Sequence, residues 1–173
     1  MDRMSDIHEG VTLGEGGTSK EPVVERALEH LVDIVNGLIR REIATAAALE
    51  TAGERLDDGA LARLAIELEA SHRERIDSLS TLASDLGGDP AESSNLRSLL
   101  DRARVRLREL RGDTGILDAL CAIETELASE YRRELGTVGF TDEERQVLAV
   151  GLFAADRAFR KLRAAAPQAP AIH

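Results

Sequence analysis

Apolar residues recur three or four positions apart, which is the spacing of one face of an α-helix. The first such segment begins near Pro22, ends at Gly53, and carries the apolar stripe Leu28, Leu31, Val35, Leu38, Ile39, Ala46 and Leu49. The second begins after Asp57 or Asp58, either of which can cap it, and ends at the turn Gly87-Gly88-Asp89-Pro90. These patterns predict two long amphipathic helices.

The second half of the chain carries three further helical patterns. A shorter one covers about residues 92–111, and a long one runs from about Thr114 to Leu135. The last helix opens with Thr141, which is followed three residues later by Glu144, and ends before Pro167. Thr and Glu at this spacing form a capping box, in which each side chain bonds a backbone amide of the other residue.

These elements predict an all-α fold, with residues 21–165 as one helical bundle between tails at residues 1–20 and 166–173. The shorter helix lies between the second and third long helices. An extra helix at that place can carry the chain along the length of the bundle, as in ferritin-like connectivity. We therefore predict a ferritin-like four-helix bundle with an extra crossover helix.

Composition and charge narrow the function classes. A net charge of -10 argues against a nucleic-acid-binding surface, which needs clustered Lys and Arg. The chain has no apolar stretch long enough to cross a membrane, one cysteine, Cys121, and no signal-peptide pattern at its start, so we expect a cytoplasmic protein. No phosphate-binding loop, nucleophile elbow or zinc-spaced cysteine pair is present, and we predict no catalytic residue.

Four polar residues fall on the apolar stripes. Glu42 lies on the stripe of the first helix, Glu69 and His72 on the second, and Glu124 on the third long helix. Carboxylates are costly in a core unless they are paired or bind a cation. Inward Glu residues together with a Glu-x-x-His pair are the ligands that helical bundles offer to iron or manganese. The pattern predicts a metal site in the core.

A less specific interpretation remains open for each of these residues. A modest rotation of the helices places the acids at the edge of the core, where they are solvated or paired with Arg40, Arg41 or Arg73. His72 is then a neutral core histidine, bonded to a neighbour such as Tyr131.

The chain resembles the ferritin-like superfamily, and more narrowly small bacterial ferritin-like domains of unknown function. The resemblance covers residues 31–162 and rests on the Glu and His residues above, the turn at 87–90, the spacing from Glu124 to Tyr131, and the ending Asp156-Arg157-Ala158-Phe159-Arg160-Lys161-Leu162. Ferritin-like di-iron proteins have a second Glu-x-x-His in the last helix, where this chain has Phe153 and Asp156. The resemblance therefore implies one metal or none, with ligands from the set Glu42, Glu69, His72, Glu124 and Asp156.

Two hypotheses follow. The first is a ferritin-like protein that binds iron or manganese and has a weak oxidase or iron-handling role. The second is a metal-free structural or protein-interaction module on a degenerate ferritin-like bundle, for which Glu42→Gln leaves stability unchanged or raises it because an unneeded buried charge is removed. Self-association through helix faces, giving a homo-oligomer, is compatible with both.

Overall fold

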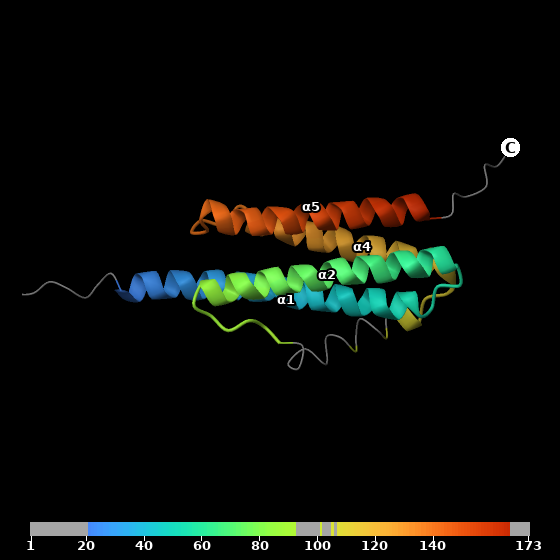
Figure 1. Cartoon of the computed structure of the whole chain (residues 1–173), viewed down its shortest axis with the longest axis horizontal. Coiled ribbons are helices and arrows are strands. Elements are labelled where there is room, and N and C mark those ends of the chain that lie inside the picture. Colours follow the sequence, from blue (N-terminus) through green and yellow to red (C-terminus); the bar gives the residue numbers. More distant parts are fainter. Residues whose placement is uncertain (1–20, 93–100, 102–104, 106, 167–173) are drawn as a thin grey trace, which may run out of the picture.

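The computed structural model describes residues 21–92, 101, 105 and 107–166 of the 173-residue chain. These residues contain four long helices and no strand: α1 (Glu21–Gly53), α2 (Gly59–Asp85), α4 (Gly112–Glu134) and α5 (Asp142–Ala165). Figure 1 shows the four helices running along one long axis. The described part of the chain is therefore all-α and consistent with a four-helix bundle.

Three predicted segments fall largely outside the described residues. They are the crossover helix at 92–111, of which 93–100, 102–104 and 106 are not described, and the tails at 1–20 and 166–173. These predictions remain predictions. Within the described ranges, no helix combines the length and the apolar character needed to cross a membrane.

Two helices begin at capping residues that the sequence predicts. The side chain of Asp58 accepts hydrogen bonds from the backbone amides of Ala60 and Leu61 at the start of α2. Thr141 and Glu144 form the capping box at the start of α5, each bonding the other's backbone amide. Side-chain oxygens in these places satisfy amides that have no partner within the helix, so local chemistry fixes both helix starts.

Polar contacts fix the turn between α1 and α2 against the start of α4. The carboxylate of Asp113 accepts hydrogen bonds from the backbone amides of Asp57 and Asp58 at 2.9 and 3.0 Å. Within that turn, Arg55 donates to the backbone carbonyls of Leu107 and Leu110. This end of the bundle is held by hydrogen bonds as well as by apolar packing.

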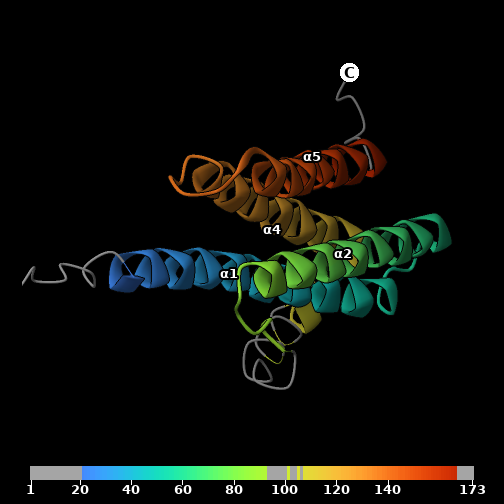
Figure 2. The ribbon, with the colours of Figure 1, turned by 60° about the vertical axis from the view of Figure 1, so that its left-hand side comes forward.

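The helices form two antiparallel pairs, α1 with α2 and α4 with α5, which Figure 2 shows from a second direction. Their buried side chains form two apolar clusters. One contains Ile39 of α1, Leu79 of α2 and Leu127 of α4; the other contains Leu49 of α1 and Leu68 of α2 among its members. Along α1, α2 and α4, buried polar residues occur between the part of the helix that contributes to one cluster and the part that contributes to the other. These polar residues form the candidate site.

The first turns of α1 extend beyond this core. Residues 23–30 are all exposed, and burial starts at Leu31. Leu28, which the sequence places on the core stripe, is 41% exposed, and Val24 one turn earlier is 58% exposed. The prediction that Leu28 lies on the core face was wrong, because the apolar stripe of α1 begins before the point at which the other helices start to cover it. We call residues 23–30 the α1 overhang.

Candidate functional site

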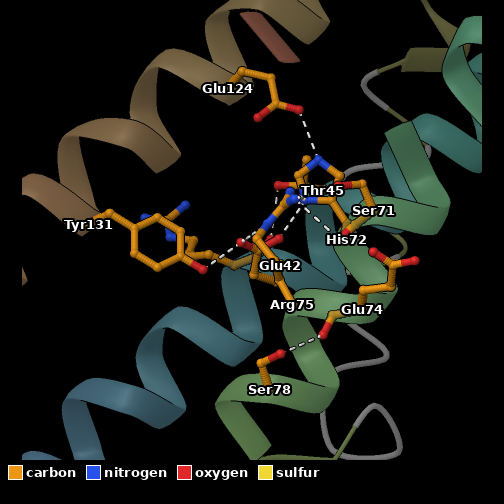
Figure 3. Close-up of polar contacts among 10 residues, drawn as sticks. Glu42, Thr45, Ser71, His72, Glu74, Arg75, Ser78, Glu124 and Tyr131 are labelled. Atoms are coloured by element: carbon orange, nitrogen blue, oxygen red, sulfur yellow. Dashed lines mark hydrogen bonds and ion pairs between the residues drawn. The ribbon is translucent and has the colours of Figure 1, made fainter. Parts of the chain in front are cut away.

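Five buried residues from three helices meet in the core, and we call them the polar layer; one of them, Tyr131, also belongs to the first apolar cluster. They are Glu42 of α1, His72 and Arg75 of α2, and Glu124 and Tyr131 of α4. Figure 3 shows their side chains pointing toward one another. Glu42, His72 and Tyr131 are 0% exposed, Glu124 is 1% exposed and Arg75 is 7% exposed. Such burial makes every unpaired charge costly, so the contacts within the layer decide what it can do.

Glu42 is the common acceptor of the polar layer. Its Oε1 accepts hydrogen bonds from Arg75 Nε at 2.8 Å and from the Tyr131 hydroxyl at 2.6 Å. Its Oε2 lies 2.5 Å from His72 Nδ1. Burial by itself raises the pKa of Glu42, but hydrogen bonds and charges from His72 and Arg75 outweigh burial and lower the pKa below its usual value. Glu42 is therefore an ionised carboxylate in the core.

His72 bridges the two acids. Its Nδ1 faces Glu42 and its Nε2 lies 2.9 Å from Glu124 Oε1. Burial lowers the pKa of His72, but the hydrogen bonds to Glu124 and Glu42 and the charges of both acids outweigh burial and raise it. Both ring nitrogens face carboxylate oxygens, and only the protonated ring carries a donor on each nitrogen. The geometry is that of an imidazolium between two carboxylates.

Arg75 supplies the second positive charge. Its Nη1 donates to the backbone oxygen and to the hydroxyl of Ser71, at 3.1 and 2.9 Å, and its Nη2 lies 2.6 Å from His72 Nδ1. The guanidinium pairs with Glu42 through Oε1, whereas His72 faces Oε2 of the same carboxylate. Because Nδ1 of the imidazolium donates to Glu42, its approach to Nη2 is a contact between two donors and not a hydrogen bond. With Glu42 and Glu124 negative and His72 and Arg75 positive, the charges of the layer balance.

Tyr131 closes the layer toward α5. Burial raises the pKa of its hydroxyl, and the neighbouring Glu42 charge raises it further, so the hydroxyl stays protonated and donates to Glu42. The ring lies against Gly151 of α5, where a Cβ atom would come within 2.4 Å of two ring atoms. The missing side chain at Gly151 makes the room that the ring occupies.

The structure brings together three of the five predicted site residues, Glu42, His72 and Glu124. The other two lie elsewhere. Glu69 lies at the edge of the core with its side chain 16% exposed, and its Oε1 accepts from the exposed Arg73 at 2.6 and 2.8 Å. Asp156 is partly exposed on α5 and lies 3.6 Å from Arg132 of α4, and Phe153, on the same helix, is 61% exposed.

Arg75 is the member of the layer that the sequence reasoning missed. It follows His72 by three residues and precedes the buried Leu79 by four, so it lies on the core face of α2. A charged residue at this spacing is the signal that could have identified it. Of the partners predicted for the three acids, namely Arg40, Arg41 or Arg73, the structure confirms Arg73 for Glu69, whereas Glu42 pairs with Arg75, which was not among them.

The donor set does not fit a ferritin-like two-metal centre. Both oxygens of Glu42 and both ring nitrogens of His72 already face protein partners, and the layer receives no carboxylate or imidazole from α5. Within the described ranges, no three His, Cys, Asp or Glu side chains are grouped in a way that could hold a metal ion. One group remains: Glu124 Oε2 is buried and has no hydrogen-bond partner among the described residues.

Fold and site together define a helical-bundle protein with a charge-balanced polar layer in its core. The chain matches the family described as Domain of unknown function (DUF2383) over residues 30–136, more than half of its length, and it belongs to that family. All five residues of the polar layer lie within the matched range, whereas the α1 overhang falls almost entirely before it and α5 after it. The comparison with curated proteins found no match.

Proposed function

We propose that this protein is a metal-free interaction module built on a four-helix bundle of ferritin-like type. One observation carries the proposal: both oxygens of Glu42, the acid at the centre of the polar layer, already have protein partners, Arg75 and Tyr131 at Oε1 and His72 at Oε2. A metal ligand must offer a lone pair to the ion, and three of the roughly four lone pairs of this carboxylate already accept hydrogen bonds from the protein, two of them from cationic groups that would repel the ion.

Charge balance supports the same conclusion. Two carboxylates face two cationic side chains, so the layer is neutral without a metal. A divalent ion added to this set would be a third positive centre, within a few ångströms of a buried guanidinium. His72 and Arg75 would have to lose or displace their charges before such an ion could bind.

A second candidate is a protein that holds one iron or manganese ion between Glu124 and His72. The observation that favours it is Glu124 Oε2, a buried carboxylate oxygen with no partner in the described part of the chain. Native buried polar atoms usually have a partner, so an orphaned oxygen is a reason to look for a missing cation. The two candidates differ in what the purified protein contains.

Metal analysis of untagged protein, purified without chelator, separates them. We expect only trace iron and manganese in the native protein and in His72→Ala. Iron or manganese near one ion per chain in the native protein, lost in His72→Ala while the helical circular dichroism signal is kept, would establish the second candidate instead.

The interaction surface of the proposed module is the α1 overhang. Val24, Leu28, Leu31 and Val35 are spaced by four, three and four residues, which is the seam of a coiled coil, and the bundle covers only the last two. Glu25 borders the uncovered part of the seam, with Glu29 one turn further on, and the whole chain carries a charge of -10. We infer that the partner is an amphipathic helix of another protein with an apolar seam and basic flanks.

A pair of synthetic helical peptides tests this surface. Both have the same leucine seam, and one has lysine and the other glutamate on its flanks. We expect fluorescence anisotropy to show binding of the lysine peptide alone, weakened by salt and reduced about tenfold or more in Leu28→Ser. Equal binding by Leu28→Ser would refute the assignment. If the protein self-associates as its concentration rises and Leu28→Ser abolishes this, the seam binds a second copy of the chain. If the protein binds the peptide only after residues 1–20 are deleted, those residues cover the seam.

A further inference from the structure

Arg75 stands where a cation would be needed if the polar layer bound a metal. Its Nε lies 2.8 Å from Glu42 Oε1 and its Nη2 lies 2.6 Å from His72 Nδ1. These two atoms are also the donors that α1 and α2 could offer to an ion. The side chain is 8% exposed, so the guanidinium is enclosed with them in the core.

The guanidinium is fixed in this place by further contacts. Nη1 bonds both the carbonyl oxygen and the hydroxyl of Ser71, one turn earlier on α2. An arginine held by several hydrogen bonds in a planar fork loses little further freedom when it also pairs with a carboxylate. Arg75 is therefore a preorganised positive charge.

We propose that Arg75 is a built-in cation that takes the place of a divalent metal, and that the layer becomes a metal site when Arg75 is replaced by a neutral residue. This inference rests on the proposed function, because it assumes that the native layer is metal-free. It goes further by naming the residue that excludes the ion.

The chemistry of the remaining groups suits a divalent cation once the guanidinium is gone. Glu42 keeps a carboxylate that accepts from Tyr131, and neutral His72 offers Nδ1 on the same side. The other ring nitrogen, Nε2, then carries the proton and donates to Glu124 Oε1. A carboxylate that orients a metal-binding histidine through its second nitrogen is a common arrangement in metal sites. Two carboxylates and one divalent ion again balance in charge.

Equilibrium dialysis against zinc tests the proposal, because imidazole and carboxylate ligands both suit zinc. The set comprises the native protein, Arg75→Ala, the double variant Arg75→Ala with His72→Ala, and Arg73→Ala as the matched control. Arg73 lies two residues earlier on the same helix, and its exposed side chain pairs with Glu69 at the surface. We expect Arg75→Ala to bind about one zinc ion per chain, and the other three proteins to bind none at this site.

Each outcome bears on one of the two claims. Zinc bound at His72 in the native protein would overturn both the metal-free function and the role of Arg75. A folded Arg75→Ala that binds no more zinc than the native protein would overturn the role of Arg75 and leave the proposed function standing. Zinc that the double variant also binds would place the ion outside the polar layer and count against the inference.

A second variant covers the case in which Arg75→Ala does not fold. Arg75→Gln removes the charge, keeps much of the side-chain volume, and retains an amide that can donate to Glu42. Its amide oxygen can also serve as a zinc ligand, so the same dialysis applies. We expect zinc to raise the melting temperature of Arg75→Gln and to leave that of Arg73→Ala unchanged, and no rise in Arg75→Gln would refute the proposal.

Discussion

Glu42→Gln is expected to lower the free energy of unfolding by about 3–5 kcal/mol. The substitution hardly changes the shape of the side chain, so the loss comes from charge and hydrogen bonding. Without the carboxylate, Arg75 and His72 remain buried with only Glu124 to balance them. Because many domains have only about 5–15 kcal/mol of stability in total, the variant should be close to unfolding.

Urea denaturation followed by circular dichroism measures this effect, with Glu69→Gln as the control. Glu69 undergoes the same chemical change on α2, but it lies at the edge of the core and pairs with the exposed Arg73. We expect its substitution to change stability by no more than about 1 kcal/mol. If Glu42→Gln cost as little as Glu69→Gln, the polar layer could not be an ionised network.

This expectation reverses the one drawn from the sequence for a metal-free bundle. From the sequence, Glu42 is a lone buried acid, and replacing a lone buried charge by an amide is neutral or stabilising. The structure adds Arg75 and a doubly bonded His72 to the same carboxylate. Removing one member of a paired set leaves the others unpaired, which is the costly case.

The helices were predictable because their signals are local. The start of α2 at Asp58 and that of α5 at Thr141 follow from side chains that bond backbone amides within a few residues. The burial of Glu42, His72 and Glu124 was also predictable, since each continues an apolar stripe. Spacing alone was sufficient for these features.

The rotation of α2 was harder to predict, and it separates Arg75 from Glu69. A helix turns by about 100° per residue, so Arg75 and Glu69 lie about 60° to opposite sides of His72. The buried residues Leu68 and Leu79 lie on the Arg75 side, which takes Arg75 into the core and leaves Glu69 at its edge. Glu69 was predicted to enter the site because of the Glu-x-x-His spacing, although the centre of the apolar stripe of α2 lies on the opposite side of His72.

The same geometry explains the last helix. Its buried positions are Leu148, Gly151, Ala155, Ala158 and Leu162. Asp156 lies about 120° around the helix from the centre of that buried face. The resemblance aligned Asp156 with a metal ligand, but this side of α5 does not face the polar layer. The residue of α5 that faces the polar layer, against the ring of Tyr131, is Gly151, which has no side chain to bind an ion.

Gly151→Ala is expected to cost about 1–3 kcal/mol of stability although alanine favours helix formation. The added Cβ would lie 2.4 Å from two ring atoms of Tyr131 and 2.8 Å from its hydroxyl oxygen. The ring is fully buried and tied to Glu42, so it cannot move aside without breaking a hydrogen bond of the polar layer. Gly37→Ala on α1 is the control, because its Cβ would meet nothing within 4 Å and should stabilise the helix.

A double-mutant cycle with Tyr131→Leu assigns the cost to this contact. Leucine lacks the ring, so in that background Gly151→Ala should be neutral or should stabilise by up to about 1 kcal/mol through helix propensity. The difference between the two backgrounds, measured by urea denaturation, is the coupling between α5 and the polar layer. An equal cost in both backgrounds would mean that the Tyr131 ring is not what Gly151 accommodates. The link from α5 through Tyr131 to Glu42 would then have to be abandoned.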